Sequence, residues 1–339
     1  MKAGERASRE SLLAIVRRLR GRRILVLADL VADEFVYGRV ERVSREAPVL
    51  ILRHDASDVR LGGGANAAHN IRTLGGTPVP IGVLGRDAYG ARLRQLLREK
   101  GISASRVFAD PSYATPVKSR ILAGGVHSTK QQIVRIDTLA PLRERSEARR
   151  KVLAALRSAP RVDGVLVSDY GMGLLTRDVV ETAVALARRR GIPVTVDSRY
   201  GLLVFRGMTA VTPNEPELEA ALGLNIGHDL GKLERAGRAV LRRLRAKAVL
   251  VTRGSDGMAL FEPGRKTLHI PIYGSDEVAD VTGAGDTVIA TFTLALAAGA
   301  TPAAAGRLAN YAGGIVVMKR GTATAGAAEL LAAVRDDRG

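Results

Sequence analysis

The sequence predicts an α/β fold in which a mainly parallel sheet is covered by helices on both faces, with a small β-lid beside it. Short β-branched runs alternate with longer amphipathic stretches along most of the chain, as strands and helices do around a parallel sheet. Two more polar segments, at about 34–60 and 113–137, interrupt this alternation. We therefore expect one domain over residues 1–339, with a lid formed by these two segments.

The individual elements follow from the spacing of the apolar residues. Runs rich in Val, Ile and Leu predict strands at 23–28, 79–84, 162–168, 193–197, 209–212 and 248–252. Apolar side chains at helical spacing predict helices at 66–74, 89–100, 146–158, 176–190, 215–222, 229–245, 284–298 and 302–319. Within the lid segments, alternating polar and apolar residues at 48–53 and 131–137 predict antiparallel strands.

The composition argues against several classes of protein. Cysteine is absent from the 339 residues, which excludes disulfides and Cys-ligated metals. No apolar run approaches the ~20 residues that cross a bilayer, so we expect no membrane partner and a cytoplasmic protein. The net charge is +18, but aromatic residues make up only 4% and no nucleic-acid motif occurs. Because the arginines cluster near the ends of predicted helices, we interpret them as a solvated surface and expect no nucleic-acid partner.

The most informative motif is Asp280-Val-Thr-Gly-Ala-Gly-Asp286, which leads directly into a long apolar helix. Gly283 and Gly285 allow a tight turn and the close approach of a ligand. The free N–H groups at such a helix start attract anionic oxygen. A carboxylate there suits a base that takes a proton from a hydroxyl while the N–H groups hold a phosphoryl group. The alternative is an Asp that caps a glycine-rich turn.

Further polar turns follow other predicted strands. Carboxylates at the carboxyl edge of a parallel sheet suit sugar hydroxyls, and a run of glycines lets a polyol lie against the backbone. Each turn taken alone has a structural explanation, such as helix capping by Asn214 and Glu217. Together they predict a ligand site at one edge of the sheet, built from Asp29, Asp33, Gly62, Gly63, Asn66, Asp169, the 197–199 segment, the 212–217 segment and the 252–257 segment.

Several common nucleotide or hydrolase motifs are missing. The sequence contains no Gly-x-x-x-x-Gly-Lys-Ser/Thr loop, no Gly-x-Gly-x-x-Gly after the first strand and no Gly-x-Ser-x-Gly elbow. These absences argue against a P-loop nucleotidase, a dinucleotide-binding domain and an α/β-hydrolase.

The ordered set of motifs resembles the ribokinase-like (PfkB) carbohydrate kinases over about residues 22–331. The resemblance depends on Gly62-Gly63 and Asn66, Thr212-Pro-Asn214 with Glu217, Thr252 with Gly257, Thr282-Gly-Ala-Gly-Asp286, and Asn310. Within that family the chain is most similar to D-glycero-β-D-manno-heptose 7-phosphate kinases, through Tyr37-Gly, 44–49, Gln131-Gln with 135–137, Ser168-Asp-Tyr170 and 280–289.

The resemblance implies a three-layer α/β/α fold and the transfer of phosphate from ATP to a sugar. Asp286 would be the base, and the backbone N–H groups of Gly283, Ala284 and Gly285 would form the anion hole. The residues expected along ATP are Asn214, Thr252, Gly254, Ser255, Gly257 and Asn310. Glu217 would support Mg²⁺ through water, and Asp280 and Thr282 would lie where relatives bind a monovalent cation such as K⁺.

The resemblance also implies which residues hold the sugar. These are Asp29, Asp33, Gly62, Gly63, Asn66 and Asp169. The basic lid residues Lys118, Arg120 and Arg135 would clamp a phosphate if the acceptor carries one. Exposed lid strands would favour a homodimer.

Four departures leave the acceptor sugar open. The chain has Ala28 where the subgroup has Gly, Gly171-Met172 where it has Ala-Lys, and Ser198-Arg199 where it has Pro-Lys. The lid is also expected to be longer, at 123–130. The alternatives are therefore another sugar or nucleoside kinase of the same fold, similar to ribokinase or fructokinase, and a non-catalytic sugar or nucleotide sensor.

Overall fold

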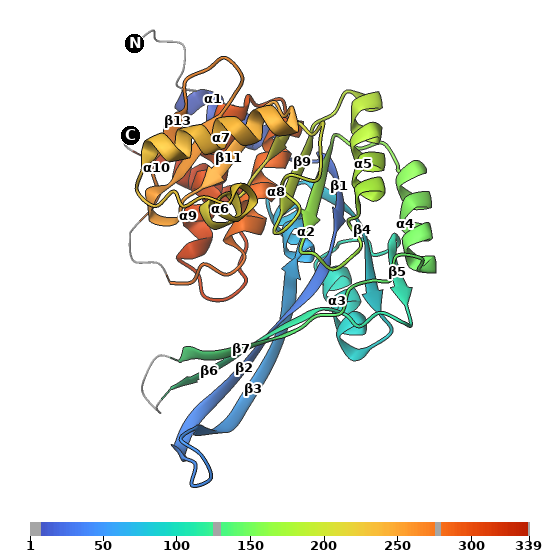
Figure 1. Cartoon of the computed structure of the whole chain (residues 1–339), viewed down its shortest axis with the longest axis vertical. Coiled ribbons are helices and arrows are strands. Elements are labelled where there is room, and N and C mark those ends of the chain that lie inside the picture. The colour runs from blue at the N-terminus through green and yellow to red at the C-terminus, as the bar shows by residue number, and fades with distance from the viewer. Residues whose placement is uncertain (1–7, 125–129, 275–278, 338–339) are drawn as a thin grey trace.

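The computed structural model describes residues 8–124, 130–274 and 279–337. Most of the lid extension expected at 123–130 lies outside these residues. A body of helices and strands carries a long, thin sheet that projects from it (Figure 1).

The body is built on a sheet in the order β13-β12-β11-β10-β9-β8-β1-β4-β5. The strands from β11 to β5 in that order pair in parallel, and β12 and β13 add an antiparallel edge. Their bounds are β1 Arg23–Ala28, β4 Thr77–Gly85, β5 Val107–Asp110, β8 Gly164–Asp169, β9 Val194–Ser198, β10 Ala210–Val211, β11 Ala248–Thr252, β12 Met258–Phe261 and β13 Leu268–Ile270. The predicted mainly parallel sheet is confirmed.

Helices cover both faces of this sheet, because successive side chains of each strand point to opposite faces. In β1, Ile24 and Val26 pack into one hydrophobic core and Leu25 and Leu27 into the other. The first core is closed by α1 Arg9–Arg18, α2 Gly64–Thr73, α3 Ala88–Glu99, α8 Ala284–Ala297, α9 Pro302–Val317 and α10 Ala327–Asp336. The second is closed by α4 Glu147–Arg157, α5 Arg177–Arg190, α6 Glu215–Leu222 and α7 Leu230–Leu244.

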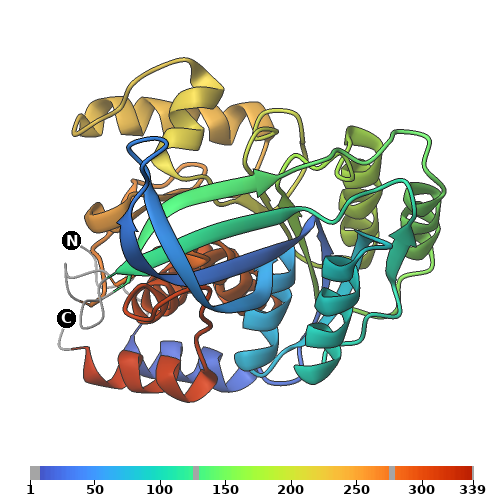
Figure 2. The same ribbon diagram turned by 90° about the horizontal axis from the view of Figure 1, so that it is seen from below.

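The lid is a second sheet in the order β3-β2-β6-β7. Its strands are β2 Leu30–Val43, β3 Leu50–Gly63, β6 Val117–Gly124 and β7 Gln131–Thr138. β2 starts directly after β1, and β3 leads into α2, so the base of the lid is continuous with the body. Viewed from below, the lid strands cross in front of the body (Figure 2).

Every predicted helix is present, and the predicted strands of the body match within a few residues, whereas the lid strand predicted at 48–53 corresponds to β3 and extends to Gly63. The sequence reading did not predict α1, α10, β5, β12 or β13, which lie at the chain ends or at the sheet edges. No helix in the described ranges is both long and apolar enough to cross a membrane.

Candidate active site

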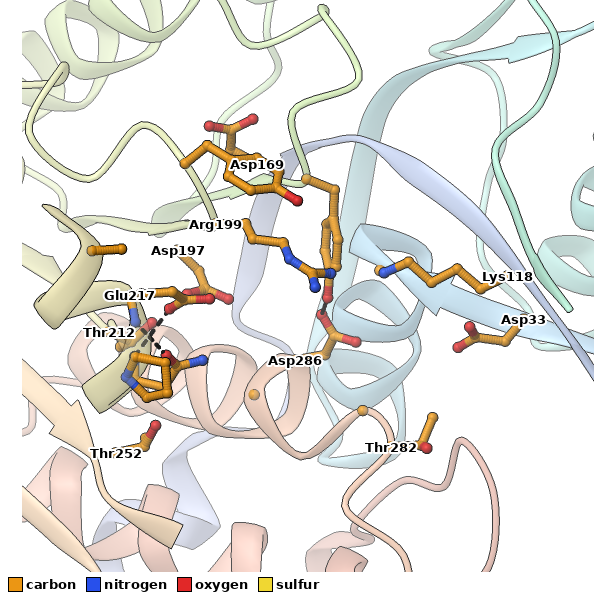
Figure 3. A pocket seen from close by; sticks show the side chains of 18 of the residues that line it. Asp33, Lys118, Asp169, Asp197, Arg199, Thr212, Glu217, Thr252, Thr282 and Asp286 are labelled. Atoms are coloured by element: carbon orange, nitrogen blue, oxygen red, sulfur yellow. Dashed lines mark hydrogen bonds between the residues drawn. The ribbon is translucent and has the colours of Figure 1, made fainter. Parts of the chain in front are cut away.

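A cavity of about 500 Å³ lies where the carboxyl ends of the central strands meet the base of the lid. Side chains after β8, β9, β10 and β11 form one wall, and the lid and the start of α8 form the rest. In Figure 3, Asp197 and Glu217 lie on one side, Asp33 and Lys118 on the other, and Asp286 between them. The lining consists of Asp33, Gly63, Lys118, Arg120, Asp169, Tyr170, Asp197, Arg199, Tyr200, Thr212, Asn214, Pro216, Glu217, Ala220, Thr252, Thr282, Gly283, Gly285 and Asp286.

Asp286 lies in the first turn of α8 at the floor of this cavity, with 3% of its surface exposed. Its Oδ1 accepts a hydrogen bond from the Tyr170 hydroxyl (2.8 Å), and its Oδ2 accepts one from Asn66 Nδ2 (3.1 Å). Burial raises the pKa of Asp286 to about 7, although these two hydrogen bonds and Lys118 act in the opposite direction. A carboxylate with a pKa near neutrality suits a general base.

Asn66 is held in one orientation by a buried network between α2 and α8. Its Oδ1 accepts from Asn70 Nδ2 (3.2 Å), so its own amide N–H must face Asp286. Asn70 is fixed in turn, because its Oδ1 accepts from the Thr287 hydroxyl (3.0 Å) and the Ala325 N–H (3.3 Å). Asn66 therefore lies behind Asp286 and supports it.

The turn before α8 presents backbone to the cavity. Gly283 has φ +79°, and an added Cβ would lie 2.6 Å from Asn66 Nδ2, so only glycine fits there. At Gly285 an added Cβ would meet nothing within 4 Å, which shows that this position faces open space. The N–H of Ala284 donates to the carbonyl of Val281 (3.2 Å), so this amide is already engaged within the turn. The amides of Gly283 and Gly285 are thus better placed to receive an anion.

Asp33 of β2 is held at the base of the lid. Its Oδ1 pairs with Arg120 Nη1 of β6 (2.7 Å), and its Oδ2 accepts from the Thr322 hydroxyl (2.8 Å). A Cβ on Gly62 would lie 2.5 Å from Asp33 Oδ2, so a side chain there would displace the carboxylate. The glycine run of β3 thus keeps room for Asp33 as well as for a ligand.

Asp197 and Glu217 form an acidic pair on the opposite wall. Burial and repulsion by Glu217 raise the pKa of Asp197 well above its usual value. Glu217 also accepts from the Asn214 N–H (3.0 Å) and completes the capping box of α6. Two half-buried carboxylates that repel each other suit a cation that keeps several waters, as Mg²⁺ does. In 8–124, 130–274 and 279–337, no cluster of three or more His, Asp or Glu side chains could ligate a metal directly.

Comparison with known proteins identifies the family. Residues 29–328 match the pfkB family of carbohydrate kinases. The chain belongs to this family. The expectation of a phosphotransferase that acts on a sugar is thereby confirmed.

Curated relatives extend along nearly all of this chain. The bifunctional protein HldE of Geotalea uraniireducens (strain Rf4) is 41% identical over 334 residues, which are 97% of this chain and 66% of the relative. The bifunctional protein HldE of Rhodospirillum rubrum is 41% identical over 331 residues, 96% of this chain and 65% of the relative. The chain thus spans about two thirds of the length of these relatives.

Solved structures confirm the ribokinase-like three-layer fold. The ribokinase of Arabidopsis thaliana, complexed with ribose and ATP, superposes with a TM-score of 0.71 at 21% identity, over 94% of this chain and all of that one. The phosphofructokinase-2 of Escherichia coli, in complex with potassium, gives a TM-score of 0.72 at 20% identity, over 93% and 98% of the two chains. At these identities the likeness establishes the fold alone.

For this pfkB-family protein, the structure brings most of the predicted residues to one cavity. Its lining includes Asp33, Gly63, Arg120, Asp169, Asn214, Glu217, Thr252, Thr282, Gly283, Gly285 and Asp286. Glu217 and Thr252 come from neighbouring parts of the sheet edge, since Asn214 forms a parallel bridge with Thr252.

Other predicted residues lie outside this lining. Asp29 is buried behind it, where its Oδ2 accepts the N–H groups of Tyr170 (2.9 Å) and Met172 (3.1 Å). Arg135 is on the exposed strand β7 and pairs with Asp137 (2.8 Å). Asp280 borders a neighbouring cavity under the lid, where it accepts the N–H groups of Thr282 and Gly321 (2.9 Å each).

Part of the predicted ATP set also lies outside the cavity. Gly254, Ser255 and Gly257 form the turn between β11 and β12. Asn310 of α9 donates to the Pro271 carbonyl (2.9 Å) and borders a separate pocket of about 270 Å³.

The sequence reading gave no role to the Tyr170 hydroxyl or to Tyr200, and it placed Asp197 and Arg199 at the ligand edge of the sheet without a specific role; all four residues line the cavity. Asp197 ends the strand predicted at 193–197 and Arg199 follows it, which is the signal that placed them at the sheet edge. For the hydroxyl of Tyr170 no local signal existed, because its partner Asp286 is 116 residues away.

Proposed function

We propose that this protein transfers the γ-phosphoryl group of ATP to D-glycero-D-manno-heptose 7-phosphate at O1, giving the 1,7-bisphosphate. The observation that carries the proposal is Asp286, a buried carboxylate with a pKa of about 7 that faces a cavity beside the Gly283–Gly285 turn. The motifs similar to those of heptose 7-phosphate kinases, and the 41% identity to two HldE proteins, support the choice of sugar.

The reaction needs little covalent work from the protein, so positioning and charge stabilisation dominate. Asp286 would take the proton of the sugar hydroxyl as its oxygen attacks phosphorus. The amides of Gly283 and Gly285 would receive the negative charge of the transferred group. Mg²⁺, when bound, would offset charge on the phosphates of ATP; Asp197 and Glu217 would hold it through water. Asp280 and Thr282 remain our candidates for a K⁺ site.

A phosphorylated acceptor is supported by the cations in the cavity. Lys118, Arg120 and Arg199 all line it. Arg120 is paired with Asp33, whereas Lys118 and Arg199 have no carboxylate within 4.0 Å in the described part of the chain. A sugar phosphate brings up to about two negative charges at neutral pH and would pair with these groups. We leave Arg135 out of this clamp because it is already paired with Asp137 on an exposed strand.

The assembly and location are also proposals. β7 is an exposed edge strand with Ile133, Val134 and Ile136 at 45%, 46% and 55% exposure, and pairing with the lid of a second copy would cover them. Light scattering of the purified protein would show a dimer. Because the reaction consumes ATP, we place the protein in the cytoplasm.

A coupled assay of ADP formation tests the function. Heptose 7-phosphate, free heptose, fructose 6-phosphate, fructose and ribose would be compared at equal concentration with ATP and Mg²⁺. We expect the highest kcat/KM for heptose 7-phosphate. Lys118→Met should raise KM for the phosphorylated sugars about 10-fold or more, with little change for free sugars. Equal turnover of phosphorylated and free sugars would contradict the proposal.

A further inference from the structure

Both carboxylate oxygens of Asp286 accept hydrogen bonds from other side chains of the protein. The Asn66 amide and the Tyr170 hydroxyl approach from different elements, α2 and the segment after β8. Each carboxylate oxygen can accept two hydrogen bonds, so one position on each remains for a ligand. These two hydrogen bonds thus fix the orientation of the carboxylate without a contribution from a ligand.

We propose that Tyr170 is a positioning residue for the base, which holds Asp286 ionised and turned toward the acceptor hydroxyl. This inference rests on the proposed function, because it assigns Tyr170 a role in that same phosphoryl transfer.

Tyr170 is itself held rigidly enough for this role. Its N–H donates to Asp29 Oδ2 (2.9 Å), which anchors the backbone at the end of β8. Its ring lies under the ammonium group of Lys118, 4.3 Å from the ring centroid. Gly63 leaves room beside the ring, because an added Cβ there would lie 3.1 Å from Tyr170 Cε2. Asp29 and Gly63 thus both help to hold Tyr170 in place.

The hydroxyl of Tyr170 acts as a donor. Burial and the nearby charge of Asp286 raise the pKa of Tyr170 well above its usual value, so the phenol stays protonated throughout the working range. A donor to a carboxylate favours its ionised form, and this opposes the effect of burial on Asp286.

The other charged groups around Asp286 come from the lid and from β9. Asp33 disfavours the ionised form of Asp286 and Lys118 favours it. Asp197 repels the ionised form as well. Arg199 lies in the same cavity and faces Lys118 and Glu217. Removal of the Tyr170 hydroxyl leaves all these charged groups in place. The effect of the hydroxyl on the protonation of Asp286 can therefore be measured separately from theirs.

The test is the pH profile of kcat/KM for heptose 7-phosphate in Tyr170→Phe, compared with the parent protein. Phe keeps the ring under Lys118 but removes the donor. We expect the acid limb to move up by about one pH unit or more. Activity should then fall about 10-fold at pH 6.5 and much less at pH 9.

Tyr89→Phe is the matched control. It also removes a tyrosine hydroxyl that donates to a carboxylate, Glu34 Oε1 (2.9 Å), but outside the cavity. Its acid limb should stay where it is in the parent protein. If Tyr170→Phe folds poorly, 3-fluorotyrosine at position 170 replaces it. A stronger donor of nearly the same shape should move the acid limb down.

The outcomes separate this inference from the proposed function. An unchanged acid limb in Tyr170→Phe, or the same shift in both Phe variants, would overturn the role of Tyr170. Full activity of Asp286→Asn would instead overturn the proposed function. Loss of activity in Asp286→Asn, together with opposite shifts for Phe and 3-fluorotyrosine at position 170, would support both.

Discussion

The hydroxyl of Thr322 donates to Asp33 Oδ2 over 2.8 Å and ties the lid to the segment after α9. That segment also contacts the turn before α8, because the N–H of Gly321 donates to Asp280 Oδ2 (2.9 Å). The lid carboxylate and the anion-binding turn are therefore joined through two adjacent residues, Gly321 and Thr322. The orientation of Asp33 should therefore influence the conformation of the turn before α8.

Thr322→Val removes this hydrogen bond and keeps the shape of the side chain. Among the residues that the structure describes, Asp33 then retains only Arg120 as a hydrogen-bond partner and can turn away from the acceptor. Because a hydrogen bond to a charged group contributes about 1.5–3 kcal/mol, we expect KM for the sugar to rise about 10-fold. KM for ATP should change little. Steady-state kinetics with each substrate varied in turn would measure this.

Thr324→Val is the control for that change. It makes the same substitution two residues further on, where the hydroxyl has no hydrogen-bond partner among the described residues. If the two variants raise KM for the sugar equally, the link between Asp33 and Thr322 has no role in binding.

The pH dependence of turnover should follow Asp286. The base must be ionised to accept a proton, and burial raises its pKa to about 7. We therefore expect kcat/KM to be constant above that pH and to fall about 10-fold per unit below it. Asp286→Asn should lower kcat by ~10²-fold or more. Substrate phosphates also titrate near pH 6, so the residual activity of Asp286→Asn, measured over the same range, gives their contribution. An identical acid limb in both proteins would assign it to the substrates.

The buried carboxylate of Asp286 should also destabilise the folded protein at neutral pH. Its folded pKa, about 7, lies above the ordinary 3.8, so the folded state binds the proton more tightly than the unfolded state. Stability linked to this group is therefore highest below about pH 4 and declines as pH rises toward 7, by at most ~4 kcal/mol. Asp286→Asn should recover about 1–2 kcal/mol of this at pH 8. The recovery is only partial because the new amide N–H would face the N–H donor of Asn66. Urea unfolding of both proteins at pH 5 and pH 8 would show that the stability of the variant relative to the parent rises with pH.

Local pattern was enough to predict the central strands and most helices, because the strands are continuous apolar runs buried on both faces and the helices have one buried face each. It was also enough to place Asp286 in the first turn of α8. The short edge strands β12 and β13 were missed because four and three residues give too little periodicity to detect. The terminal helices α1 and α10 were missed because they pack against each other, and no local pattern reveals a contact between the two ends of the chain.

The partners of the site residues could not be predicted for the same reason. Asn66 was expected to hold the sugar, but its amide faces Asp286, which is 220 residues away. Asp29 was expected at the cavity, yet it supports the backbone of Tyr170. Both residues belong to the right edge of the sheet. What each side chain touches there depends on tertiary packing, which spacing along the chain does not encode.

Gly285→Ala separates the anion-binding turn from the stability of the fold. An added Cβ at Gly285 would meet no protein atom within 4 Å, and the residue lies in the first turn of α8, so Ala should be tolerated and should raise stability by about 0.4–1 kcal/mol. The same methyl group would occupy space that the proposed function gives to the phosphoryl group. The backbone N–H is retained, but the methyl group would hold the phosphoryl group away from it, so we expect kcat to fall ~10²-fold, the range for an anion-hole contact that is lost.

Gly283→Ala provides the contrast, because its φ is +79° and its Cβ would lie 2.6 Å from Asn66 Nδ2. This variant should lose activity and stability together. Thermal unfolding and the ADP assay on both variants would distinguish a turn that only shapes the fold from one that binds phosphate. A methyl group at a turn that binds the phosphoryl group must impair catalysis. If Gly285→Ala is stable and retains full turnover, the phosphoryl group is therefore not bound at this turn.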